Sequence, residues 1–494
     1  MKMIYIDPPY NTGSDFVYRD NFAMSSEEYA DELGQTDETG NRLFKNTDSN
    51  GRFHSDWCSM MYSRLMLARN LLSDDGVIFI SIDDNEIENL QKIAREIFGD
   101  NNIEVLIWNK EAEGSSGTLK QVSTTRRIHE YIVCACKNKK HTQYHKIHEA
   151  IKGREGEFQT ANLAVNAEKE NKNHPNYFTI RNPFGEHFAK QWKWNKNEIK
   201  RLIDENLICW GSDGHKQPRL IIPTDERRTT YLLSILNYGG TTIGRKDFEN
   251  LFAENIEFSY PKPIILMKKI LGTVMGENEI VLDFFSGSAT TAHAVMQMNS
   301  EDNGHRKFIM VQLPEETDEK SEAYKAGYKN ICEIGKERIR RAGRKIVEEN
   351  KDKEGIENLD IGFRVFKLDD SNMNDVYYSP AEYSQNLLSM LESNVKSDRS
   401  DLDLLFGCLL EWGLPLSMPY TSEQIEGCTV HTYNDGDLIA CFDENIPDDV
   451  VKTIAKRQPL RAVFRDSSFN GSPAKINVGE IFKMLAPDTK VKVI

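Results

Sequence analysis

The sequence lacks three features that each mark a class of proteins. No apolar run approaches the ~18 residues of a membrane-spanning helix, so we expect neither a membrane span nor a membrane partner. The first residues have neither the length nor the cleavage pattern of a secretory signal peptide. The eight cysteines are scattered, without a CxxC pair or a Cys/His cluster at zinc-binding spacing. We therefore expect reduced thiols, no structural metal and a cytoplasmic location.

Positive charge is scarce over most of the chain. The net charge of −15 argues against a protein that coats nucleic acid without selectivity. Residues 139–230 differ, because they hold 17 Lys and Arg against 12 Asp and Glu. One locally basic segment in an acidic chain suits a polyanion that binds at one place. A solvated insertion with a surplus of lysines explains the same numbers.

The most unusual motif follows the first apolar run. Residues 3–6 predict a buried strand, which stops at Asp7, Pro8, Pro9 and Tyr10. Proline has no N–H, fixes its own φ and keeps the preceding residue extended, so this loop is stiff. The Asp7 carboxylate and the Pro8 carbonyl can both accept from one amino group, beside the ring of Tyr10 as a stacking face. An amine on a flat heterocycle fits this set, although an ordinary strand-to-loop turn uses the same residues.

Strands and helices alternate after this motif. The pattern predicts helices at 57–72 and up to residue 98, and strands at 77–82, 105–108 and 130–135. Such alternation is typical of a doubly wound α/β sheet, in which ligands bind beyond the carboxyl ends of the strands. Asp83 and Asp84 follow one strand and either belong to that edge or cap the next helix. Residues 138–222 interrupt the alternation with basic, amide and aromatic side chains, which predicts an inserted subdomain.

A second motif lies in the later part of the chain, after a predicted helix at 264–271. A strand ends at Asp283, a Gly/Ser-rich turn around Gly287 follows, and a helix begins near Thr290. Glycine and small residues let backbone N–H groups approach a ligand at a helix N-terminus. The strand at 307–312 precedes Glu315, at a position where a nucleotide ribose is often held. A Gly-Ser turn also occurs without any nucleotide.

Residues 315–349 predict a charged helix. Arg338, Arg341 and Lys345 share one face of it at spacings of three and four. That face either follows a phosphate backbone or is simply solvated.

The order of these motifs resembles the permuted (β-group) S-adenosylmethionine-dependent amino-methyltransferases of DNA. In that group the catalytic motif precedes the cofactor motif, and a target-recognition domain lies between them. Over almost the whole chain the sequence is similar to the modification (Mod) subunits of type III restriction–modification systems. The matching stretches are residues 4–13, 75–86, 129–132, 261–263, 281–291, 307–315, 362–366 and 461–469.

The resemblance implies an α/β fold: a doubly wound, mostly parallel, Rossmann-like methyltransferase sheet with an inserted target-recognition subdomain and a C-terminal α+β domain. It divides the chain into four parts. These are a catalytic half at 1–137, the target-recognition subdomain at 138–222, a cofactor-binding half at 223–349, and a partner or dimerisation domain at 350–494.

The resemblance also implies roles for single residues. Asp7, Pro8 and Pro9 would hold the target amine, and Tyr10 would stack on a base flipped out of the duplex. The cofactor, S-adenosyl-L-methionine, would lie against Asp283, Phe285, Gly287, Ser288 and Thr290, with Asn11, Lys262 and Pro263 near its methionine end and Glu315 at the ribose.

The implied function is methylation of adenine N6 in double-stranded DNA, and cytosine N4 enzymes use close variants of the motif. Partners would be a second copy of the chain and a restriction (helicase–nuclease) subunit. Ala289 stands where many relatives have a second glycine. Relatives also carry a longer segment before the catalytic strand, so a truncated, non-catalytic binding subunit is an alternative. Protein-glutamine methyltransferases are a further one, but they present Asn rather than Asp before the prolines.

Overall fold

The computed structural model describes most of the chain: residues 1–13, 16–18, 43–45, 53–111, 125, 127–149, 159–210, 217–222, 228–252, 256, 258, 260–374, 395–469 and 472–494. These residues form two compact units, Met1–Gly362 and Phe363–Ile494. No helix in these described ranges is both long and apolar enough to cross a bilayer.

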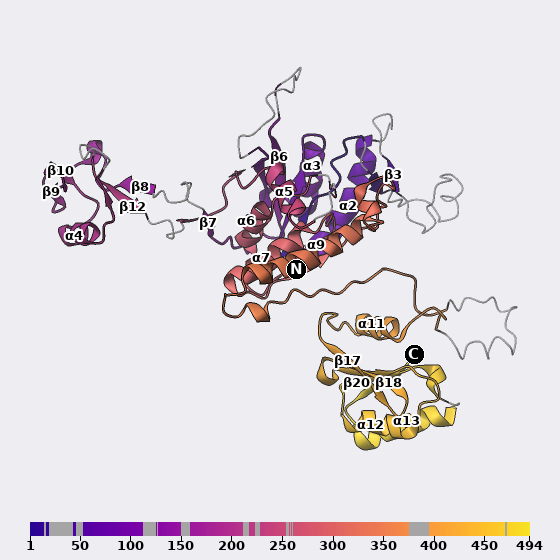
Figure 1. The fold of residues 1–494 in the computed structure, drawn as a ribbon. Helices are drawn as coiled ribbons and strands as arrows, with labels where there is room; N and C mark the ends of the chain where they lie inside the picture. Colours follow the sequence, from indigo (N-terminus) through magenta and orange to yellow (C-terminus); the bar gives the residue numbers. More distant parts are fainter. Residues whose placement is uncertain are drawn as a thin grey trace. The chain divides into compact units, whose positions relative to one another are not determined.

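A seven-stranded sheet is the centre of the first unit (Figure 1). Its strands, in spatial order, are β14 (Ile235–Leu236), β5 (Ile103–Asn109), β6 (His129–Cys136), β4 (Val77–Ile82), β1 (Met3–Ile6), β15 (Ile280–Asp283) and β16 (Lys307–Met310). All neighbours are parallel except β6, which is antiparallel to both β4 and β5. The predicted doubly wound, mostly parallel sheet is therefore confirmed, with one reversed strand.

The central strands β1, β4 and β15 are mostly apolar because both faces of the sheet are covered. In β1, Ile4 and Ile6 face one core, whereas Met3 and Tyr5 face the other. Helices α2 (Phe53–Leu71) and α3 (Ile87–Phe98) complete the first core. Helices α6 (Ile264–Val274) and α7 (Thr290–Asp302) complete the second. The sequence predicted α2, α3 and α6 within a few residues of these bounds, and it predicted the start of α7 near Thr290.

The prediction of one helix from 315 to 349 is wrong in its first part. Only the short α8 (Glu322–Lys325) and then α9 (Ile331–Glu349) are helical. An antiparallel bridge between Glu316 and Asn330 and the turn at Gly327 take up the backbone before α9. Helix α9 packs against α7, and α5 (Thr241–Glu249) precedes α6 in the chain.

The inserted segment has its own small core. A hairpin of β9 (Tyr177–Arg181) and β10 (His187–Gln191), a three-stranded sheet of β8 (Gln159–Asn162), β11 (Ile208–Cys209) and β12 (Arg219–Ile222), and α4 (Lys196–Asp204) make up its elements. Trp192, Leu163 and Ile199 are among its buried residues. At the two ends of the segment, β7 (Ile147–Glu149) pairs with β13 (Arg228–Thr230). A further short pair, β2 (Phe16–Tyr18) with β3 (Leu43–Lys45), follows the first motif.

The second unit combines a five-stranded sheet with helices, in agreement with the α+β class expected for the C-terminal part. The strands are β17 (Tyr420–Ile425), β18 (Cys428–Tyr433), β19 (Leu438–Cys441), β20 (Arg461–Phe464) and β21 (Lys490–Val493). Its helices are α11 (Asp401–Glu411), α12 (Asp448–Lys456) and α13 (Ser472–Leu485). Helices α12 and α13 share one core with the sheet, and α11 lies in the other.

Candidate active site

Three acids meet at one edge of the central sheet. Strand β1 lies between β4 and β15 and is parallel to both, so all three carboxyl ends point the same way. Asp7, Asp83 and Asp283 stand at or just beyond those ends, as the sequence predicted. Asp83 also accepts a hydrogen bond from the backbone N–H of Asn85, 2.9 Å away, and so closes the turn before α3. The fold therefore brings the predicted site residues Asp7 and Asp283 to the same side of the sheet.

The Asp7 carboxylate is held by a buried ammonium group. Lys262 donates from Nζ to Oδ1 and Oδ2 of Asp7 at 2.9 and 2.7 Å, and to the Tyr10 hydroxyl at 3.0 Å. The Lys262 side chain is only 7% exposed. Burial opposes its charge, but the nearby carboxylates of Asp7 and Glu130 outweigh burial and raise the pKa of Lys262. Lys262 is therefore a cation at neutral pH, in contact with the proposed catalytic carboxylate.

The phenol of Tyr10 completes this charged group. Its hydroxyl lies 2.9 Å from Oδ1 of Asp7 and 3.1 Å from Oε2 of Glu130, and donates its one proton between them. Burial and these two carboxylates raise the pKa of Tyr10 well above its usual value. The Lys262 ammonium also lies 5.2 Å from the centre of the Tyr10 ring and 5.6 Å from that of Trp108. The hydroxyl thus stays protonated, and its contacts fix the orientation of the ring.

Hydrogen bonds to Trp57 and Glu86 anchor the loop after β1. The indole Nε1 of Trp57 donates to the Pro9 carbonyl at 2.8 Å. Asn11 adopts a left-handed φ of 59° and donates to the buried carboxylate of Glu86 at 2.6 Å. Within the described ranges no donor reaches the Pro8 carbonyl. That carbonyl is consequently available to a ligand, as the stiff Pro-Pro sequence suggested.

The loop after β15 has a different environment. Asp283 is 2% exposed, and its carboxylate accepts from Thr291 Oγ1 at 2.6 Å and from the Phe285 N–H at 3.2 Å. Burial raises the pKa of Asp283 to about 7. Gly287 takes a φ of 47°, and its N–H donates to Gln312 Oε1 at 2.7 Å. One N–H that the sequence assigned to a ligand is thus occupied by a side chain.

The other predicted cofactor residues surround this loop. Gln312 also donates to Glu315 Oε1 at 3.4 Å, so Glu315 lies beside the Gly287 turn, and burial raises the pKa of its carboxyl. The rings of Phe284 and Phe285 lie 5.5 Å apart. Pro263 is buried at the start of α6, directly after Lys262. Apart from Glu315, which follows β16, the predicted residues therefore lie in the two loops after β1 and β15 and directly before α6, where Lys262 contacts Asp7 and Tyr10.

Ser288 and Thr290 point away from solvent towards helix α9. Arg338 Nη1 donates to Ser288 Oγ and to Thr290 Oγ1, each at 2.7 Å. Both interpretations of Arg338 as part of an exposed basic face are wrong, because its side chain is 0% exposed. Arg341 is half-buried against the ring of Phe252, 4.7 Å from its centre. Arg338 therefore lies on the buried side of α9, together with Gly335 and Ala342.

Sequence reasoning missed the supporting residues. Glu130, Trp57, Glu86, Gln312 and Arg338 all hold the two loops, yet each lies far along the chain from the loop it contacts. Glu130 stands in an apolar strand, where a charged residue is unusual. That was the one local signal available.

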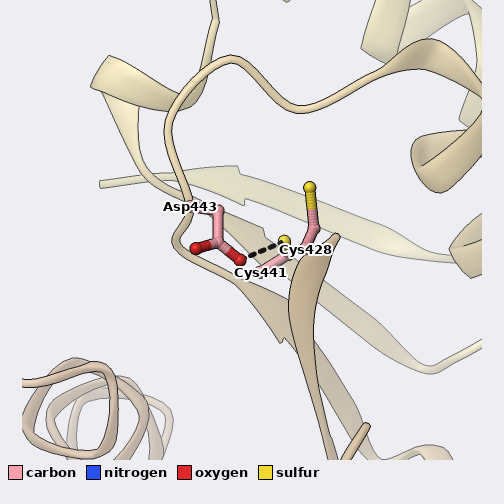
Figure 2. A group of neighbouring side chains, drawn as sticks. All are labelled: Cys428, Cys441 and Asp443. Carbon is pink, nitrogen blue, oxygen red and sulfur yellow. Dashed lines mark hydrogen bonds between the residues drawn. The ribbon is translucent and has the colours of Figure 1, made fainter. Parts of the chain in front are cut away.

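A second group of polar side chains lies in the sheet of the second unit (Figure 2). Cys428, Cys441 and Asp443 each offer an atom within 4.8 Å of the others. Asp443 accepts from the Thr429 backbone N–H and from the Cys441 thiol. Burial raises the pKa of the Cys441 thiol to about 12, so the thiol stays protonated at neutral pH. We interpret the group as a hydrogen-bonded part of the core, and the expected lack of a structural metal stays a prediction.

Comparison with known proteins assigns the family. A family model described as DNA methylase (N6_N4_Mtase) matches residues 1–342. The StyLTI Mod subunit of a type III restriction-modification enzyme from Salmonella typhimurium is 35% identical, over 74% of this chain and 57% of its own length. The EcoP15I Mod subunit from Escherichia coli is 30% identical, over 74% and 62%. The chain thus covers less than two thirds of the length of these relatives.

Comparison with solved structures gives matches at low scores only. The crystal structure of M1.HpyAVI gives a TM-score of 0.27 and 12% identity, over 68% of this chain and 87% of that one. The cytosine-N4-specific PvuII DNA methyltransferase gives 0.28 and 12%, over 69% and 86%. The assignment rests instead on the family match, which includes both loops, the whole central sheet and most of α9. The chain belongs to the N6/N4 DNA methylase family.

Proposed function

We propose that the chain is the modification subunit of a type III restriction–modification enzyme and methylates adenine N6 in DNA with S-adenosyl-L-methionine. One observation carries the proposal: the Asp7 carboxylate and the unoccupied Pro8 carbonyl lie at the same sheet edge as the Asp283 loop. The acceptors for the target amino group therefore lie next to the loop that would bind the cofactor. The similarity to the Mod subunits supports the substrate class.

The target amine would bind between Asp7 and Pro8. Its two N–H groups would donate to one carboxylate oxygen and to the Pro8 carbonyl, so the nitrogen lone pair is less delocalised into the base. Lys262 donates to both Asp7 oxygens in the free protein. The amine must therefore displace the ammonium from one of them. Lys262 keeps its contact with the Tyr10 hydroxyl and lies close to Glu130, at 3.8 Å.

The chemistry needs no covalent enzyme intermediate. A nitrogen–carbon bond forms as the sulfur–carbon bond of the cofactor breaks, and a thioether leaves. The nitrogen then loses a proton through the Asp7 carboxylate to water. The cofactor supplies the methyl group, while this chain orients the amine and stabilises the positive charge that develops on nitrogen.

The loop after β15 offers backbone N–H groups that could bind the cofactor. Among the described residues, no acceptor takes the backbone N–H of Ser288 or Thr290 at the start of α7. Such N–H groups favour an anionic group, here the carboxylate of the methionine part. Glu315 lies beside the turn and would accept from ribose hydroxyls. Asp283 would hold the loop in place, since its carboxylate already binds Thr291 and Phe285.

We assign target recognition to the inserted segment, residues 138–222. Its small core is its own, and a pocket of about 210 Å³ in it is lined by amide and guanidinium groups, including Asn162, Asn166, Gln217 and Arg219. Such groups pair with base edges in DNA. The local surplus of positive charge supports contact with the phosphate backbone.

The remaining parts of the proposal concern assembly. Tyr10 would stack on an adenine flipped out of the duplex. Residues 350–494 would contact a second copy of the chain and a restriction subunit, in a cytoplasmic complex. The methyltransferase halves would be residues 1–137 and 223–349.

The test is transfer of labelled methyl from S-adenosyl-L-methionine to unmethylated genomic DNA, with mass spectrometry of the modified base. N6-methyladenine is the expected product. N4-methylcytosine would correct the base, and no transfer together with cofactor binding by calorimetry would point to a missing segment or partner. No transfer and no cofactor binding would overturn the proposal in favour of a non-catalytic binding subunit.

A further inference from the structure

Arg338 is a fully buried cation without an ion pair among the described residues. Its side chain is 0% exposed, and Nη1 donates to Ser288 Oγ and Thr290 Oγ1. Nε and Nη2 are buried with no hydrogen-bond partner. Its guanidinium carbon lies 5.6 Å from the centre of the Phe248 ring. All its hydrogen bonds therefore go to the loop after β15.

This arrangement does little for the stability of the fold. A buried guanidinium loses its hydration, and only a well-paired charge recovers that free energy. Burial accordingly lowers the pKa of Arg338 to about 10, which still leaves it protonated at neutral pH. An apolar side chain of similar length would fill the same space with a smaller desolvation penalty. It would lack the donor that joins the two hydroxyls.

The hydroxyls flank a strained residue. Ala289 takes a φ of 61° and ψ of 39°, the left-handed conformation, which is unfavourable for a non-glycine residue. Strained backbone persists where surrounding contacts determine it. Helix α9 supplies those contacts: a Cβ on Gly335 would lie 3.2 Å from the Gly287 carbonyl oxygen, so the helix already touches the loop. One turn further, Arg338 ties down Ser288 and Thr290 on either side of Ala289.

We propose that Arg338 is a positioning residue for the cofactor loop. By binding the hydroxyls of Ser288 and Thr290, it turns these side chains into the protein and holds Ala289 in its left-handed conformation. The backbone N–H groups of both residues, which have no acceptor in the described chain, then remain available for the cofactor. Arg338 acts through the loop and does not touch the transferred methyl group. The inference rests on the proposed function, because it needs a cofactor at this loop.

The test compares Arg338→Met with Arg344→Met on the same helix. The Arg344 side chain is 68% exposed, with its nearest carboxylate, Glu337, 4.0 Å away, so its loss controls for a general effect of removing charge from α9. We expect Arg338→Met to weaken cofactor binding by roughly tenfold or more in calorimetry, as for the loss of charged hydrogen bonds. The KM for cofactor should rise while kcat at saturating cofactor changes little. Arg344→Met should bind as the wild type does.

Two further variants separate positioning from folding. Arg338→Lys keeps a charge and one donor group, so its cofactor affinity should lie between those of wild type and Arg338→Met. The double variant Ser288→Ala/Thr290→Val removes the acceptors from the loop and leaves Arg338 in place. It should lose affinity comparably, and adding Arg338→Met to it should cause little further loss.

The outcomes are distinct. If the wild-type chain binds no cofactor, the proposed function itself fails. If the wild type binds and either Arg338→Met or the hydroxyl double variant binds equally well, the positioning role is wrong. If Arg338→Met does not fold, the double variant alone decides. A loss of thermal stability with unchanged cofactor affinity would mean a purely structural Arg338.

Discussion

The strands β1 and β15 are adjacent and parallel, and an aspartate stands where each of them ends, yet the two carboxyl groups have different partners. Asp7 has an ammonium nitrogen 2.7 Å from one of its oxygens. Asp283 has hydroxyl and amide donors and no basic side chain within 4 Å among the described residues, and burial raises its pKa to about 7. The same residue type at equivalent ends of two strands thus has an ammonium partner in one case, and hydroxyl and amide donors with a raised pKa in the other.

The difference follows from the neighbouring elements. Lys262 reaches Asp7 because it stands at the start of α6, whereas the elements around Asp283 contribute Thr291 and a backbone N–H. Arg338, a cation beside the second loop, binds the hydroxyls of Ser288 and Thr290 instead of Asp283. Under the proposed function, an acceptor held by a cation suits the binding of an amine that becomes positively charged. A buried acceptor held by uncharged donors suits a loop with a fixed conformation.

Asp7→Ala removes the carboxylate at the loop after β1 and should have the largest effect on activity. We expect methyl transfer to fall by about 10²–10⁴-fold, because the amine loses the acceptor for its proton. Cofactor affinity should be nearly unchanged, since the second loop is intact. Labelled methyl transfer and calorimetry measure the two effects, with the exposed Asp74→Ala as control. Full activity in Asp7→Ala would disprove the catalytic assignment.

Asp283→Asn tests whether the buried Asp283 carboxyl makes the free energy of unfolding depend on pH. The unfolded chain ionises this carboxyl near pH 3.8 and the folded chain near 7. The stability from its neutral form is therefore complete below about pH 4 and is lost as pH rises through 7. Urea unfolding of the cofactor-free wild type should show a loss on the order of a few kcal/mol over this range.

Asp283→Asn should remove most of that pH dependence, because an amide does not titrate. Asp74→Asn, whose side chain is 83% exposed, is the matched control and should keep the wild-type slope. An unchanged slope in Asp283→Asn would show that the buried carboxyl is not the group responsible.

Lys262→Met tests the counter-ion of the first loop. It leaves Asp7 without its ammonium partner, and we expect the free energy of unfolding to fall by about 1–3 kcal/mol, less than for a fully buried pair. Lys110→Met is the control, because Lys110 contacts Glu130 at 3.4 Å and is more exposed than Lys262. Equal losses in the two variants would mean that the Lys262–Asp7 pair contributes no more to the free energy of unfolding than the Lys110–Glu130 pair.

Glu315→Gln should have the smallest effect. The carboxamide keeps an oxygen beside Gln312 but loses the charge, so cofactor affinity should fall by roughly tenfold or less. Calorimetry at neutral pH measures it, with methyl transfer at saturating cofactor unchanged. A loss of kcat instead would place Glu315 near the reacting atoms and not at the ribose.

Much of the fold was predictable because its signals are local. The strand at 77–82 is apolar at every position except Ser81 and is buried throughout, since both faces of the sheet are covered there. The helix starting near Thr290 follows from the turn before it. Strand β6 was predicted as a strand, but not as the reversed one, because a sequence pattern carries no direction of pairing. The helix at 315–349 was overextended, since charged residues that favour helices also stand in its bridged turn.

The sequence by itself determined the two motifs, the strands that carry them and the family, since backbone preferences and apolar periodicity lie in contiguous residues. Only the tertiary structure decided where charges are paired. Lys262 and Asp7 are 255 positions apart, and no sequence feature near either residue predicts that they form a pair. The spacing of Arg338, Arg341 and Lys345 defines one side of a helix, but whether that side meets solvent depends on what packs against it. Here the loop of Ser288 and Thr290 packs there, so Arg338 lies inside the protein.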